Sequence, residues 1–189
     1  MKIGLLFGSF NPVHTGHLII ANTVLNELAF SKIWFVVSPQ NPLKENASLL
    51  AAEKRLMLVE KAINNDSRFA SSDAEFTLPL PSYTIDTLHY FEKQYPEHHF
   101  YLIMGSDSFL QLKKWKDYET LIKKDIIVYQ RPGFSMQEES IPVNVIVIKS
   151  PLLNISATEI RTLVKTGKSI KYLVPEIVKQ LIDNQSFYK

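Results

Sequence analysis

The sequence predicts an α/β fold: a doubly wound parallel sheet with helices on both faces, followed by a helical C-terminal segment. Short runs that are apolar throughout alternate with longer segments in which apolar residues recur every three or four positions. Such runs are typical of parallel strands covered on both faces, and the alternation is typical of a Rossmann-like order of elements. After residue 150 only helical patterns remain, and we expect one domain over residues 1–189.

Each expected strand is a short and almost wholly apolar run. These runs cover residues 3–7, 33–37, 100–104, 125–129 and 143–148. Amphipathic patterns predict helices over residues 18–28, 50–64, 84–95, 107–123, 156–166 and 175–183. The first helix is buried on one face, because its apolar residues recur at positions 18, 21, 25 and 28. The fifth begins with a capping box, in which Ser156 accepts from the backbone N–H of Glu159.

The composition is ordinary for a soluble globular protein. The 189 residues are 46% hydrophobic and 21% charged, and the net charge of +2 gives no reason to expect nucleic acid or a membrane as a partner. The chain has no Cys, which excludes disulfides and thiolate chemistry. The N-terminus lacks the layout of a signal peptide and no apolar run could span a bilayer, so we expect a cytoplasmic protein.

The segment that indicates function most directly is residues 8–17, which read Gly-Ser-Phe-Asn-Pro-Val-His-Thr-Gly-His. It joins the end of the first expected strand to the start of the first helix. Backbone N–H groups are unpaired at a helix start and the helix dipole is positive there, which makes a natural anion site. The imidazoles of His14 and His17 add donors that can reach phosphate oxygens. The segment therefore predicts a phosphate-binding loop.

The residues of this loop can also be compared with other ligand-binding motifs. It lacks the Lys-Ser/Thr ending of a Walker A loop, and its glycines do not form the dinucleotide-binding fingerprint. Zinc binding is disfavoured, since the chain has no Cys and the motif carries no acidic third ligand. A tight turn whose histidines only satisfy backbone groups stays open as the alternative.

Three polar loops would meet at one edge of the predicted sheet. Residues 8–17 follow the first strand, residues 38–44 the second, and residues 105–107 the third. Ligands of open α/β sheets bind at the carboxyl ends of the strands, where these loops would lie. Ser156, Thr158 and Arg161 would present donors at a second helix N-terminus, although a helix cap alone also explains Ser156. Two such helix starts suit a triphosphate.

Two segments resemble the signatures of the nucleotidyltransferases that carry an H-x-G-H motif. One is Gly-Ser-Phe-Asn-Pro followed by His-Thr-Gly-His, and the other is Ile-Ser-Ala-Thr-Glu-Ile-Arg at residues 155–161. The middle of the chain resembles the bacterial nicotinate mononucleotide adenylyltransferases within that superfamily. Three segments of this chain are similar to segments of that family: Ser-Tyr-Thr at 82–84, Lys-Lys-Trp at 113–115 and Arg-Pro-Gly at 131–133. The resemblance runs over nearly the whole chain.

The resemblance implies transfer of the adenylyl group of ATP to the 5′-phosphate of nicotinate mononucleotide, a step of NAD biosynthesis. The products would be nicotinate adenine dinucleotide and pyrophosphate, formed by in-line displacement without a covalent intermediate. The attacking phosphate is already mostly dianionic at pH 7, so it needs no general base, and catalysis reduces to positioning and charge stabilisation. Mg²⁺ is expected on the ATP phosphates, held by them and by water, so no protein metal ligand is named.

On the ATP side, the resemblance implies that His14 and His17 donate to the phosphates around the reacting centre. Arg161 would hold the phosphates that leave, with Lys44 as a second cation. Asp107 would accept from ribose hydroxyls of the adenylyl half. The remaining positions implied to contact ATP are Gly8, Ser9, Phe10, Gly105, Ser156 and Thr158.

On the mononucleotide side, Tyr83, Thr84 and Trp115 are implied to bind the nicotinate group. A helix that starts near Thr84 offers unpaired N–H groups, which favour a carboxylate over a carboxamide. Trp115 would stack on the pyridinium ring. We therefore expect a preference for nicotinate over nicotinamide mononucleotide.

Three positions depart from the family pattern. Phe7 stands where a glycine is common, Asn11 where Asp is usual, and Lys116 where Tyr often follows the tryptophan. Phe7 and Lys116 touch the substrate side of the expected pocket.

The alternatives to this function are an adenylyltransferase for another phosphate acceptor, such as phosphopantetheine, and a non-catalytic nucleotide-binding sensor. The sequence indicates no oligomeric state.

Overall fold

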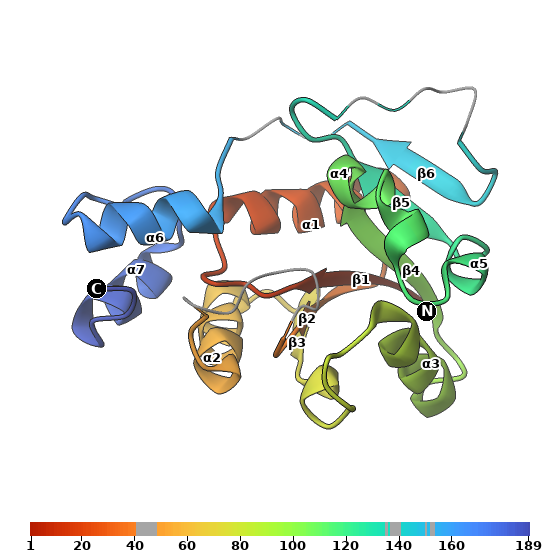
Figure 1. The fold of residues 1–189 in the computed structure, drawn as a ribbon, viewed down its shortest axis with the longest axis horizontal. Coiled ribbons are helices and arrows are strands. Elements are labelled where there is room, and N and C mark those ends of the chain that lie inside the picture. The colour runs from red at the N-terminus through yellow and green to blue at the C-terminus, as the bar shows by residue number, and fades with distance from the viewer. Residues whose placement is uncertain (41–48, 135, 137–140, 150, 152–153) are drawn as a thin grey trace.

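A parallel six-stranded sheet forms the centre of the described structure (Figure 1). The computed structural model describes residues 1–40, 49–134, 136, 141–149, 151 and 154–189. The strands are β1 (Lys2–Gly8), β2 (Lys32–Val37), β3 (Phe69–Ser72), β4 (His99–Gly105), β5 (Ile126–Tyr129) and β6 (Val145–Ile148). Their order is β3-β2-β1-β4-β5-β6, with every neighbouring pair parallel. The predicted doubly wound α/β fold is confirmed.

The helices follow the strands in the alternation that the sequence predicts. They are α1 (Thr15–Leu28), α2 (Ala52–Ile63), α3 (Thr84–Gln94), α4 (Ser106–Phe109), α5 (Tyr118–Leu121), α6 (Ala157–Lys165) and α7 (Glu176–Asn184). Two short 3₁₀ helices, η1 (Ala74–Phe76) and η2 (Leu112–Lys114), complete the described elements. The helices α6 and α7 lie together at one end of the molecule, which agrees with the expected helical C-terminal segment (Figure 1).

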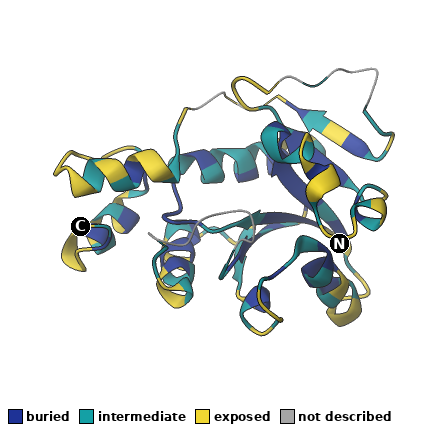
Figure 2. Cartoon of the chain, in the orientation of Figure 1, coloured by how far each residue is buried: buried dark blue, intermediate teal, exposed yellow. Residues whose placement is uncertain are grey.

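Both faces of the sheet are covered, because successive strand residues point to opposite sides. Leu6 and Ile103 belong to a cluster with buried side chains of α1, α2, α6 and α7. Leu5 and Leu102, their neighbours along the chain, belong to a second cluster with α3, η2 and α5. Figure 2 shows the same division, with buried strands in the middle and exposed outer sides on α2 and α6. This accounts for strands that are apolar throughout.

The structure departs from the expected elements at two places. The pattern over residues 107–123 predicts one helix, but the chain forms α4, η2 and α5 there. Trp115 has an extended backbone with ψ of 151°, and Asp117 is left-handed with φ of 51°, so the helix cannot continue between them. The edge strand β3 was not predicted, because Phe-Ala-Ser-Ser carries only one large apolar side chain and is half-buried.

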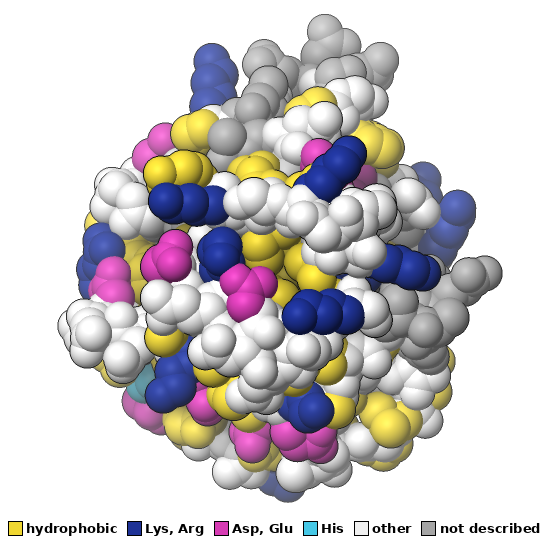
Figure 3. All heavy atoms as spheres, turned by 90° about the vertical axis from the view of Figure 1, so that its left-hand side faces the viewer, with side chains coloured by type: hydrophobic (Ala, Val, Ile, Leu, Met, Phe, Trp, Pro, Cys, Tyr) yellow, Lys and Arg dark blue, Asp and Glu magenta, His cyan; other side chains and the backbone are white. Residues whose placement is uncertain are grey.

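Positive and negative side chains are mixed on the surface (Figure 3), as the small net charge of the composition suggests. Over the face that α6 and α7 form, Lys and Arg side chains alternate with Asp and Glu side chains instead of gathering in one basic patch (Figure 3). None of the helices in the described part of the chain has the length and hydropathy that crossing a membrane requires. The order of strands reverses between β1 and β4, which is where ligands of this architecture bind.

Candidate active site

A cavity of about 740 Å³ opens at the carboxyl ends of β1 and β4. It is lined by the loop after β1, the start of α3, the segment from α4 to residue 116, and the start of α6. All the predicted site residues within the described ranges line this one cavity: Gly8, Ser9, Phe10, His14, His17, Tyr83, Thr84, Gly105, Asp107, Trp115, Ser156, Thr158 and Arg161. The predicted cation Lys44 lies outside the described residues.

The two histidines of the loop stack on one another at the start of α1. Their ring centroids are 3.7 Å apart and their planes are inclined by 25°. His14 is the N-cap residue with an extended backbone, and Gly16 leaves room for its ring, since a Cβ there would lie 3.1 Å from His14 Nδ1. The backbone N–H of His14 donates to Nδ1 of His17 at 3.2 Å. In a neutral His17 ring the proton is therefore on Nε2, which makes Nε2 a donor.

Burial holds His14 in its neutral form. The residue is 7% exposed. Burial, helped by the positive charge of Arg131, lowers the pKa of His14 from 6.5 to about 4. Its Nδ1 atom is buried and makes no hydrogen bond within the described part of the protein. This atom is enclosed against Gly16 at the start of α1, so a ligand in the cavity does not reach it.

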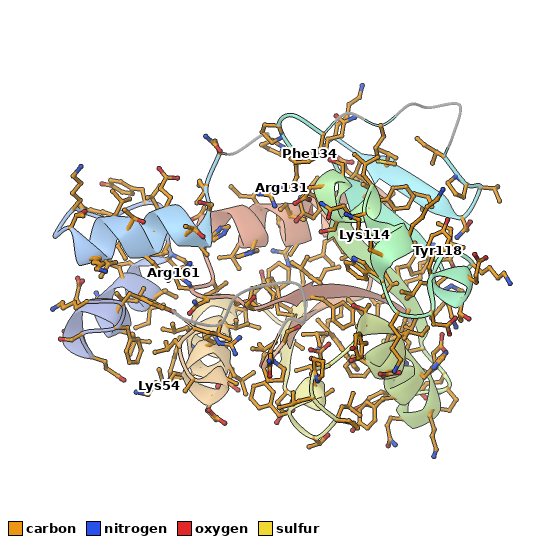
Figure 4. The ribbon with its side chains drawn as sticks, in the orientation of Figure 1. Lys54, Lys114, Tyr118, Arg131, Phe134 and Arg161 are labelled. Atoms are coloured by element: carbon orange, nitrogen blue, oxygen red, sulfur yellow. The ribbon has the colours of Figure 1, made fainter. Side chains whose placement is uncertain are left out.

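The start of α6 brings a cation to the loop after β1. Arg161 Nη1 donates to the backbone carbonyl of Asn11 at 2.8 Å, and Nη2 donates to Thr158 Oγ1 at 3.2 Å. The predicted cap is confirmed, because Ser156 Oγ accepts from the backbone N–H of Glu159 at 3.1 Å. Figure 4 shows Arg161 extending from α6, whereas Arg131 and Lys114 lie near α4. Cations therefore reach the cavity from separate elements.

Gly105 and Asp107 are packed against an arginine that the sequence analysis left without a role. Arg131 Nη1 lies 3.2 Å from Asp107 Oδ2, and both residues line the cavity. A Cβ at Gly105 would lie 2.4 Å from Asp107 Oδ1 and 2.8 Å from Arg131 Cδ, so only glycine fits beside this pair. The sequence signal that could have identified Arg131 is the Arg-Pro-Gly turn that follows β5 at the same edge of the sheet.

The start of α3 forms another wall of the cavity with Trp115. Tyr83 is the N-cap residue with an extended backbone, and Thr84 begins the helix. The ammonium of Lys116 lies 4.8 Å from the centroid of the Tyr83 ring and 2.8 Å from Asp86 Oδ2. The Tyr83 ring, the start of α3 and the ammonium of Lys116 therefore lie around the position at which we expect the nicotinate group.

A buried carboxyl group, Glu75, supports the same wall and was missed by the sequence analysis. Ser82 Oγ donates to Oε2 at 2.6 Å and Thr87 Oγ1 donates to Oε1 at 3.0 Å. Burial raises the pKa of Glu75, and these hydroxyls, with that of Ser38, oppose the rise. The contacts fix the chain on both sides of Tyr83 and Thr84. No periodic signal marks Glu75, because it lies in a short 3₁₀ helix.

Arg55 is a fully buried arginine that ties the loops at the strand ends together. Its Nε donates to the carbonyl of Leu50 at 2.7 Å. Nη1 donates to the carbonyls of Ser9 and Ser38, and Nη2 to that of Pro39 at 3.0 Å. Burial lowers its pKa from the ordinary arginine value. No local sequence pattern predicted this contact.

The described residues hold no group of three or more His, Cys, Asp or Glu side chains placed to bind a metal ion. The donors that line the cavity are instead imidazole, guanidinium, hydroxyl and backbone N–H groups, which suit anionic oxygens. A divalent ion at this site would therefore depend on oxygens supplied by a bound phosphate ligand and by water.

Comparisons with known proteins agree on one family. Residues 5–163 match the family model described as cytidylyltransferase-like. A probable nicotinate-nucleotide adenylyltransferase of Cytophaga hutchinsonii is 49% identical over 100% of this chain and 98% of its own length. The protein of the same name from Flavobacterium johnsoniae is 44% identical, with both chains covered completely. The structure of Plasmodium falciparum nicotinic acid mononucleotide adenylyltransferase complexed with NaAD aligns with a TM-score of 0.84 at 22% identity, over 99% of this chain and 97% of that chain.

Proposed function

Because the chain belongs to the cytidylyltransferase-like family, and within it to the nicotinate-nucleotide adenylyltransferases, we propose that it transfers the adenylyl group of ATP to nicotinate mononucleotide. The acceptor oxygen belongs to the 5′-phosphate, and the products are nicotinate adenine dinucleotide and pyrophosphate. This is a step of NAD biosynthesis. The observation that supports the proposal most strongly is a single cavity lined by the stacked histidines, by Arg161 and by the Tyr83–Trp115 wall.

The mechanism needs donors where negative charge collects. The 5′-phosphate attacks the α-phosphorus of ATP, the bond from that phosphorus to the bridging oxygen breaks, and pyrophosphate leaves with the bonding electrons. Nε2–H of His17 donates to a phosphate oxygen at the reacting centre, and buried His14 donates to the phosphates as a neutral imidazole. Arg161, held by Asn11 and Thr158, binds the leaving pyrophosphate with a planar fork of donors.

Three features orient ATP around that centre. Gly8, Ser9 and Phe10 bring backbone close to the triphosphate, with the start of α6 at Ser156 and Thr158 on the other side. Asp107 binds the ribose of the adenylyl half, next to Gly105. We further propose that the ATP phosphates and water would hold Mg²⁺, which would supply charge neutralisation to the triphosphate.

The wall around Tyr83 explains the expected preference for nicotinate. Backbone N–H groups at the start of α3 are satisfied by a carboxylate near Thr84, whereas a carboxamide points an NH₂ donor at one of them. Leaving buried donors unpaired costs about 1–3 kcal/mol. Trp115 stacks on the pyridinium ring, a cation–π contact of roughly 0.5–2 kcal/mol.

The proposal is tested by pyrophosphate release in the presence of ATP and Mg²⁺. Parallel reactions contain nicotinate mononucleotide, nicotinamide mononucleotide or phosphopantetheine. We expect fast release with the first and much slower release with the other two. Release with phosphopantetheine alone would identify an adenylyltransferase for another acceptor. ATP binding without release in any reaction would favour the nucleotide-binding sensor.

A further inference from the structure

Lys116 occupies a position in the cavity that the reaction mechanism leaves without a task. It directly follows Trp115 and lines the cavity. Its Nζ donates to both oxygens of Asp86, at 3.1 Å and 2.8 Å, and lies 4.8 Å from the centroid of the Tyr83 ring. Asp86 does not line the cavity, so the cation is the member of this ion pair that contributes to the cavity wall.

The position of this ammonium is set by two elements. Asp86 lies in the first turn of α3, where the helix dipole favours a carboxylate. The face of the Tyr83 ring attracts the cation from a second direction. An ammonium has three donor protons, and the two contacts with Asp86 leave one for a further acceptor. The side chain of Lys116 is 48% exposed, so its charge acts in a partly solvated setting.

We infer that Lys116 is a specificity-determining residue that selects an acceptor with a carboxylate on its pyridine ring over one with a carboxamide. The inference rests on the proposed function, because Tyr83 and Trp115 must hold that ring. The two acceptors are alike except at this group. Lys116 donates to either, but only with the carboxylate does the ammonium also gain the Coulomb attraction between opposite charges. The charge thus adds to the preference that the start of α3 provides.

The experiment compares the selectivity ratio, kcat/KM for nicotinate mononucleotide divided by kcat/KM for nicotinamide mononucleotide. We expect Lys116→Met to lower the ratio about tenfold, mainly by raising KM for the carboxylate substrate. Lys113→Met is the matched control, since Lys113 is an exposed lysine of the same segment that does not line the cavity. Its ratio should equal that of the wild type. Because the ratio compares two substrates on one variant, a general loss of folding or of ATP binding cancels.

Two further measurements separate a charge effect from a change of shape. Asp86→Asn removes the negative charge behind the ammonium, so we expect its ratio to rise. Raising the ionic strength from about 0.02 M to about 0.5 M should lower the ratio of the wild type but not that of Lys116→Met, because salt screens exposed charges.

The outcomes distinguish this inference from the function on which it rests. If the wild type releases pyrophosphate with neither pyridine nucleotide, the proposed function fails. If the wild type prefers nicotinate mononucleotide and Lys116→Met keeps the ratio within about twofold, the inference about Lys116 is overturned while the function stands.

Discussion

The imidazole rings of His14 and His17 stack with their centroids 3.7 Å apart, at the start of the helix that follows the first strand. Two positive charges at this separation would repel by roughly 4 kcal/mol in a partly solvated protein site. Burial prevents this, because it keeps His14 neutral at ordinary pH. The stack therefore allows two imidazole donors to face one phosphate without a charge conflict between them.

His17→Ala removes a donor that no neighbour replaces in the proposed mechanism. We expect kcat to fall about 100- to 1,000-fold, the range that follows from losing one donor to a developing charge. His17→Asn, which keeps an N–H donor, should recover part of this loss. Steady-state kinetics measures both effects, and the far-ultraviolet circular dichroism spectrum should stay unchanged. His89→Ala, at an exposed histidine of α3, is the control. A His17→Ala variant with nearly wild-type turnover would contradict the assigned role.

The lowered pKa of His14 gives the free energy of unfolding a pH dependence of definite sign. In the unfolded chain this imidazole takes up a proton near pH 6.5, whereas in the folded protein it does so only near pH 4. Between these values the unfolded state binds more protons, so stability falls as the pH is lowered and is regained as it rises. The full contribution is about 3 kcal/mol.

Urea unfolding of the wild type and of His14→Asn at a series of pH values measures the contribution of His14 to the pH dependence of stability. The difference between the two unfolding free energies should change by about 2–3 kcal/mol between pH 6.5 and pH 4, and should be flat above pH 7. His89→Asn provides the control, because His89 is an exposed histidine of α3 that does not line the cavity. A difference that did not vary with pH would show that His14 is not held neutral by burial.

The sequence contained most of the site because its parts are local. A helix start, a capping box and short motifs are read from residues within a few positions of one another, and every predicted site residue that the structure describes lines the cavity. The edge where they meet also follows from the parallel order of the strands. Arg55 and Glu75 could not be identified in this way. Their partners lie on other elements, and burial of a charged side chain has no local pattern.

The segment between β4 and β5 shows where periodicity misleads. Apolar residues at 109, 112, 115, 118 and 122 fit a helical repeat, yet the chain leaves the helix at Trp115 and turns at Asp117. This break directs Trp115 and Lys116 to the cavity. A tertiary requirement thus overrides the local preference at the functional site.

Arg55→Met is expected to destabilise the protein strongly. The substitution leaves the carbonyls of Ser9, Ser38, Pro39 and Leu50 without the donor that they share. A buried acceptor left without a donor costs about 1–3 kcal/mol, so losing the shared donor should lower the free energy of unfolding by several kcal/mol in total, which chemical denaturation measures. Lys54→Met on the same helix is the control, since Lys54 is exposed and its ammonium lies 5.1 Å from the centroid of the Phe187 ring. We expect that variant to change stability by less than about 1 kcal/mol.

Gly105→Ala tests whether the Asp107–Arg131 pair contributes to ATP binding. The new methyl group would lie 2.4 Å from Asp107 Oδ1 and 2.8 Å from Arg131 Cδ, so the pair must separate. Since both side chains line the cavity, we expect KM for ATP to rise about tenfold, with a smaller change in KM for the mononucleotide. Asp107→Asn keeps the shape but removes the charge, and should raise the same KM. Equal effects on both substrates would instead indicate a general disturbance of β4 and would exclude a specific role of the pair in ATP binding.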